Sequence, residues 1–121
     1  MPESDPATTV LIADDNVQFL ASASEMLRQR GFACTCVSDG AEARRQISAG
    51  VDVAVIDMNL GSVSGLQLLE EFAGDPRHAS TRYVLISGWF GEGDVERCHE
   101  RGAAATLAKP FSIEKLIEVI G

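Results

Sequence analysis

The sequence predicts an α/β domain in which five buried parallel strands alternate with five helices. Five short apolar runs recur along the chain, and segments with a helical spacing of apolar residues lie between them. Such runs suit strands that are buried on both faces, because a parallel sheet carries helices on both sides. A chain of five strand–helix units is expected to fold as a doubly wound sheet. The five runs are Thr9–Ala13, Ala33–Val37, Val53–Ile56, Tyr83–Ile86 and Ala104–Leu107.

Helices are predicted between these strands because apolar residues recur there every three or four positions. The last helix has the clearest pattern, and Ser112 stands before it in the N-cap position. The apolar face of the first helix consists of Phe19, Leu20, Ala23 and Leu27. That of the last helix consists of Ile113, Leu116, Ile117 and Ile120.

The fourth helical segment, Gly93–Arg101, has the weakest apolar face. Only Val95 and Cys98 can anchor it to a sheet. Packing of an apolar face supplies most of a helix's stability in a protein. We therefore expect this helix to be the most loosely packed of the five.

Length and charge limit the class of protein. The chain has 121 residues and a formal net charge of −8, which predicts one acidic domain and argues against binding to nucleic acid or to an anionic membrane. Its apolar runs are too short to cross a membrane, and its first residues do not resemble a signal peptide. Three cysteines, an odd number, predict reduced thiols and a cytoplasmic location. We assign residues 1–7 to a disordered tail and residues 8–121 to the domain.

Polar residues gather where the predicted strands end. Asp14 and Asp15 follow the first strand, Asp57 the third, Ser87 the fourth and Lys109 the fifth. Ligands of doubly wound sheets bind at this carboxyl edge. Three like-charged carboxylates are compatible there chiefly around a cation, and an oxygen-only site without histidine favours Mg²⁺ over zinc.

A lysine and a hydroxyl at the same edge complete the pattern. The Lys109 ammonium can pair with an anion such as a phosphoryl group, and the Ser87 hydroxyl can donate to it. A carboxylate nucleophile beside Mg²⁺, together with these two donors, can form an aspartyl phosphate. Simpler interpretations stay open for single residues: Asp15 as a helix N-cap, Ser87 as part of a turn, and Lys109 as a solvated surface charge.

With these residues in this order, the chain resembles the receiver domain of two-component response regulators. The resemblance runs from Thr8 to Ile120. It implies a flavodoxin-like fold with a five-stranded parallel sheet of strand order 2-1-3-4-5. It also implies a phosphoacceptor switch domain of a phosphorelay, which catalyses only its own phosphorylation and dephosphorylation. The segments that carry the resemblance are Leu11–Asp15, Val55–Leu60 with Gly65, Leu85–Gly88, Gly102–Ala103 and Lys109–Phe111.

The resemblance gives roles to the residues around the phosphoryl group. Asp57 would accept the group from a histidine of a sensor kinase or histidine phosphotransfer protein, and the chain would then signal to an unknown downstream protein. Ser87 would donate a hydrogen bond to the phosphoryl oxygens, and Lys109 would pair with them. Pro110 would follow a cis peptide bond.

The resemblance also gives roles to the residues around the metal. Asp15, Asp57 and the backbone carbonyl of Asn59 would bind Mg²⁺ directly. Asp14 would act largely through water.

Three departures from the family pattern concern the switch and leave the chemistry intact. Thr106 stands where the family usually has an aromatic residue that turns inward on activation. Gly61 replaces a common proline, which predicts a more mobile loop. Trp89 and Phe90 occupy a loop where many members carry smaller residues.

Three other classes of protein fit the sequence less well. A degenerate receiver that binds partners without phosphate typically lacks an acidic residue or the lysine, and all of these are present here. A phosphatase of the haloacid dehalogenase type would need an Asp-x-Asp motif on the first strand. A flavin-binding protein would need a phosphate-cradling loop after that strand, where Asp14 and Asp15 would repel phosphate.

Overall fold

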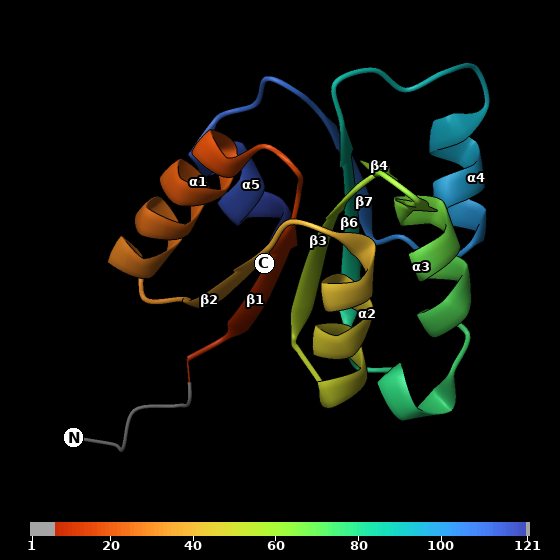
Figure 1. Cartoon of the computed structure of the whole chain (residues 1–121), viewed down its shortest axis with the longest axis horizontal. Coiled ribbons are helices and arrows are strands. Elements are labelled where there is room, and N and C mark those ends of the chain that lie inside the picture. Colours follow the sequence, from red (N-terminus) through yellow and green to blue (C-terminus); the bar gives the residue numbers. More distant parts are fainter. Residues whose placement is uncertain (1–6, 121) are drawn as a thin grey trace.

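The computed structural model describes residues 7–120 as three layers, with a sheet between two sets of helices (Figure 1). Five parallel strands form the sheet in the order β2-β1-β3-β6-β7, which confirms the predicted order, because β6 and β7 are the fourth and fifth strands of this sheet. Helices α1 and α5 cover one face, and α2, α3 and α4 cover the other. Of the predicted tail, residues 1–6 lie outside the described residues.

The bounds of the elements are close to the predicted ones. The strands of the sheet are β1 (Thr9–Ala13), β2 (Ala33–Val37), β3 (Val53–Asp57), β6 (Arg82–Ser87) and β7 (Ala105–Ala108). The helices are α1 (Val17–Gln29), α2 (Gly40–Ala49), α3 (Gly65–Phe72), α4 (Asp94–Glu100) and α5 (Ile113–Ile120), with a 3₁₀ turn at Pro76–His78. Ser112 caps α5 as predicted, because its Oγ accepts a hydrogen bond of 3.1 Å from the backbone N–H of Lys115.

The core consists of two apolar clusters, one on each face of the sheet. Successive strand residues point to opposite faces, so Leu11 joins the cluster under α2 and α3 while Ile12 joins the one under α1 and α5. All residues of β3 are buried. Continuous burial of a central strand is what a sheet covered on both sides requires.

Helix α4 is held by few apolar contacts, in agreement with the sequence. Cys98 is its one buried side chain, and Val95 is half-buried. Its N-cap residue is Gly93, which has no side chain to cap the helix. The Sγ of Cys98 lies 3.7 Å from the Sδ of Met58, so the helix touches the residue that follows Asp57.

A small antiparallel hairpin, which the sequence did not predict, follows β3. Its strands are β4 (Asn59–Leu60) and β5 (Val63–Ser64). Gly61 turns the chain with a φ of 80°, a left-handed conformation that proline cannot adopt. The position therefore carries glycine for a geometric reason, and the predicted mobility of this loop stays a prediction.

The two outer strands of the sheet are β2 and β7. In β2, the backbone groups of Ala33 and Val37 form hydrogen bonds with the chain at the two ends of β1. Successive residues of a strand direct their backbone groups to opposite sides, so the carbonyl of Cys34 points away from the sheet. Arg28 donates a hydrogen bond of 2.9 Å to that carbonyl through Nη2. The other outer strand, β7, has only four residues.

Two expectations from composition can be compared with the structure. Cys34, Cys36 and Cys98 are free, as reduced thiols would be. Within the described chain, none of the helices combines the length and the apolar character that a membrane span needs.

Candidate functional site

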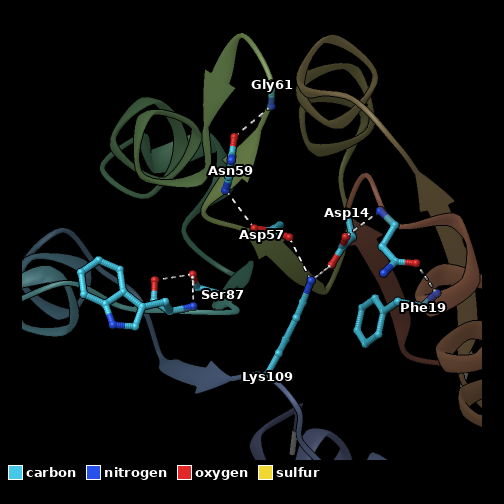
Figure 2. Close-up of polar contacts among 9 residues, drawn as sticks. Asp14, Phe19, Asp57, Asn59, Gly61, Ser87 and Lys109 are labelled. Carbon is cyan, nitrogen blue, oxygen red and sulfur yellow. Dashed lines mark hydrogen bonds and ion pairs between the residues drawn. The ribbon is translucent and has the colours of Figure 1, made fainter.

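The predicted site residues meet at the carboxyl edge of the sheet (Figure 2). Asp14 follows β1, Asp57 ends the neighbouring strand β3, and Lys109 follows β7. Carboxylate oxygens of Asp14, Asp15 and Asp57 lie within 4.8 Å of one another. Three carboxylates with no nitrogen or sulfur ligand form a donor set that suits a hard divalent cation.

Lys109 bridges two of these carboxylates (Figure 2). Its Nζ lies 2.5 Å from Oδ2 of Asp14 and 3.0 Å from Oδ2 of Asp57. The Lys109 side chain is 24% exposed, and that of Asp14 is fully buried. The ammonium therefore offsets the repulsion between two buried charges, and the interpretation of Lys109 as a solvated surface charge is wrong.

The surroundings of Asp57 disfavour its charged form. Burial raises the pKa of this carboxyl, and the charge of Asp14 raises it further. The backbone N–H of Asn59, which donates to Oδ1 at 2.9 Å, and the bond from Lys109 lower it without cancelling the rise. For Lys109, burial lowers the pKa, but the hydrogen bonds to Asp14 and Asp57 outweigh burial and raise it above its usual value.

The N-cap of α1 is Asn16, so the interpretation of Asp15 as the cap is wrong. The Asn16 side chain accepts from the backbone N–H of Phe19 at 3.0 Å, and Asp14 accepts from the backbone N–H of Asn16 at 2.9 Å. Asp15 is exposed, and its carboxylate makes no hydrogen bond or ion pair within residues 7–120. Of the three carboxylates, that of Asp15 is therefore the most accessible to a ligand from solvent.

Ser87 closes a turn, as its simpler interpretation predicted. Its hydroxyl donates to the carbonyl of Trp89 at 2.8 Å and accepts from the N–H of Trp89 at 3.1 Å. Trp89 is 80% exposed, while Phe90 packs against the core under α3. To donate to a group on Asp57, the Ser87 hydroxyl must release the Trp89 carbonyl.

Asn59 links Asp57 to the hairpin. Its side chain accepts a hydrogen bond of 3.2 Å from the N–H of Gly61, while its own N–H holds Asp57 (Figure 2). The peptide bond between Lys109 and Pro110 is cis, as the resemblance implied.

Phe19 belongs to the site but was expected only in the apolar face of the first helix. Its ring centroid lies 4.9 Å from Nζ of Lys109. Phe19 lies in the first turn of α1, four residues after Asp15 in the sequence. That proximity to the acidic pair was the one signal that could have pointed to it.

Comparison with known proteins identifies the family of this chain. Residues 10–121 match the family described as "Response regulator receiver domain". The chain belongs to this family. It is 34% identical to the regulatory protein VirG of Agrobacterium tumefaciens over 117 residues, which are 95% of this chain and 43% of VirG. It is 30% identical to the "Probable chemotaxis protein CheY" of Rhizobium etli, over 88% of this chain and 84% of that protein.

Solved structures of response regulators share the fold of this receiver domain. A receiver domain from Methylobacillus flagellatus superposes with a TM-score of 0.80 at 27% identity, over 96% of this chain and 100% of that one. A response regulator from Burkholderia pseudomallei, solved with a phosphorylated aspartic acid, calcium ion and citrate, gives 0.86 at 24% identity over 94% of this chain and 66% of that one. The chain spans less than half the length of VirG, 43%.

Proposed function

We propose that this receiver domain takes a phosphoryl group onto Asp57 from a phosphohistidine of a sensor histidine kinase or histidine phosphotransfer protein. It then signals to a downstream protein by a change of conformation. The observation that carries the proposal is the Lys109 ammonium, held between the carboxylates of Asp14 and Asp57 beside the exposed Asp15. The domain comprises residues 8–121, acts in the cytoplasm and catalyses only its own phosphorylation and dephosphorylation.

Each residue at the edge of the sheet has its own role in the transfer of the phosphoryl group. A carboxylate oxygen of Asp57 attacks the phosphorus, the bond from phosphorus to the histidine nitrogen breaks, and the imidazole leaves as a neutral ring once its other nitrogen is protonated. Lys109 turns from Asp14 toward the incoming phosphoryl oxygens, and Ser87 donates its hydroxyl to them. These two donors offset the negative charge that gathers on Asp57.

A divalent cation fits beside these residues. Asp15, Asp57 and the Asn59 carbonyl would hold Mg²⁺ directly, and Asp14 would act through water. When bound, Mg²⁺ supplies positive charge next to the phosphoryl oxygens. The exposed carboxylate of Asp15 gives the ion access from solvent.

Incubation with a small acyl phosphate tests the proposal. The chain should gain the mass of one phosphate in the presence of Mg²⁺ and none with a chelator. A degenerate receiver would show no such gain, and that result would overturn the proposal.

Removal of Asp15 is expected to weaken Mg²⁺ binding more than removal of Asp14. Asp14 is buried and already held by Lys109 and Asn16, whereas Asp15 is free to bind the ion. We expect Asp15→Asn to lower the affinity by about tenfold or more, and Asp14→Asn to have the smaller effect. Titration of Trp89 fluorescence with Mg²⁺ measures both constants. Equal losses in the two variants would contradict the distinction.

Phosphorylation is expected to loosen the segment from Trp89 to the end of α4. The Ser87 hydroxyl leaves the Trp89 carbonyl for the phosphoryl group, and α4, with one buried side chain, has little to resist the movement. Amide exchange with and without beryllofluoride should show lower protection from Trp89 to Arg101.

The matched control for this movement is Ser87→Ala. This variant has no hydroxyl to donate, so beryllofluoride should leave its amide exchange from Trp89 to Arg101 nearly unchanged. Exchange changes confined to other helices of the unmodified chain would rule the movement out.

A further inference from the structure

The aromatic ring of Phe19 lies beside Lys109, on the α1 side of the site (Figure 2). Nζ of Lys109 lies 4.9 Å from the ring centroid, within the range of a cation–π contact. The ring of Phe111 meets that of Phe19 edge to face, with centroids 5.8 Å apart and planes at 84°. Lys109 is therefore held by two carboxylates and by the negative face of an aromatic ring.

One short segment supplies two of these contacts. Asp14 accepts from the backbone N–H of Asn16, and the Asn16 side chain in turn accepts from the backbone N–H of Phe19. These bonds fix the first turn of α1 relative to the end of β1. Asp14 and Phe19 thus hold the ammonium as parts of one rigid unit.

Close packing alone does not hold the lysine in place. A cavity of about 190 Å³ lies beside it, lined by Phe19 and Lys109 with Asn16, Pro110 and Phe111. A lysine side chain has four rotatable bonds, so this space leaves it room to move whenever it gives up a carboxylate partner, and the ring limits that movement.

We propose that Phe19 is a positioning residue for Lys109, and this rests on the proposed function. When Lys109 exchanges Asp14 for the phosphoryl oxygens, its contact with the uncharged ring persists. The ring thus keeps the ammonium within reach of Asp57 while its charged partner changes. Phe111, whose ring stands nearly perpendicular to that of Phe19, keeps the ring in this orientation.

Two substitutions separate the electronic role of the ring from its volume. Phe19→Leu fills similar space without a negative face, and Phe19→Tyr keeps the face. We expect the rate of phosphorylation by acetyl phosphate to fall about fivefold in Phe19→Leu and to stay within about twofold of the unmodified chain in Phe19→Tyr. Met26→Leu, on the same helix and away from Lys109, is the matched control and should keep the full rate.

Nuclear magnetic resonance of the chain without phosphate gives a second readout. Ring current should shift the ε-methylene protons of Lys109 upfield in the unmodified chain and in Phe19→Tyr, but not in Phe19→Leu. An unaltered rate of phosphorylation in Phe19→Leu would overturn the proposal. So would equal losses of rate in the two variants while Phe19→Tyr keeps the upfield shift of Lys109. If the unmodified chain takes up no phosphate, the proposed function fails, and a Lys109 shift that Phe19→Leu leaves in place would overturn the role of Phe19 as well.

Discussion

Asp57→Asn is expected to abolish the Mg²⁺-dependent gain of one phosphate. The amide is too weak a nucleophile to form the acyl phosphate, yet its oxygen can still accept the bond from the Asn59 N–H. Because its surroundings raise the pKa of Asp57, the charged carboxylate destabilises the folded state above that pKa. The neutral variant should therefore unfold at no lower urea concentration than the unmodified chain. Intact mass after incubation with acetyl phosphate measures the loss.

The matched control is Asp39→Asn, at the same edge of the sheet. Asp39 caps α2 by accepting from the backbone N–H of Glu42 at 2.8 Å, and asparagine caps a helix equally well. This variant should take up phosphate as the unmodified chain does. Undiminished uptake in Asp57→Asn would place the acceptor elsewhere, and peptide mapping would locate it.

Lys109→Met is expected to lower the free energy of unfolding by about 3 kcal/mol in the presence of a chelator. The substitution keeps an unbranched side chain that is one atom shorter, and it leaves Asp14, which is fully buried, and Asp57 without their cation. Mg²⁺ should restore more stability to this variant than to the unmodified chain, because the ion no longer competes with an ammonium. Urea denaturation with and without Mg²⁺ measures both effects.

The chain's other lysine provides the comparison. Lys115 is 54% exposed and pairs with Glu118 at 3.2 Å on the surface of α5. Lys115→Met should change the free energy of unfolding by less than about 0.5 kcal/mol. A Lys109→Met variant as stable as Lys115→Met in chelator would show that the ammonium does not hold the two carboxylates together.

The strands of the sheet could be predicted because buried strands consist of continuous runs of apolar residues. Every residue of β3 is buried, so its run is apolar without interruption until Asp57. The hairpin after β3 could not be predicted, since strands of two residues are too short to show an alternation of apolar and polar residues. It depends on the left-handed Gly61 and on Gly65, where any side chain would meet the backbone of Asp57.

The site could be predicted as far as sheet topology determines it. Asp14, Asp57 and Lys109 follow strands whose ends must meet at one edge. The cap of α1 could not be assigned, because Asp15 and Asn16 are adjacent and aspartate and asparagine are equally good caps. The contact of Phe19 with Lys109 depends on two side-chain conformations far apart in the sequence, for which no local pattern exists.

The outer strands of the sheet bear on how the domain behaves when concentrated. An open strand edge is a template on which a second chain can add, and this is how fibrils grow. On β2 the guanidinium of Arg28 already donates a hydrogen bond to the outward-facing carbonyl of Cys34, and β7 is only four residues long. The formal charge of −8 adds repulsion between copies. Both edges of the sheet therefore offer a second chain a poor template, and we expect the domain to stay monomeric when concentrated.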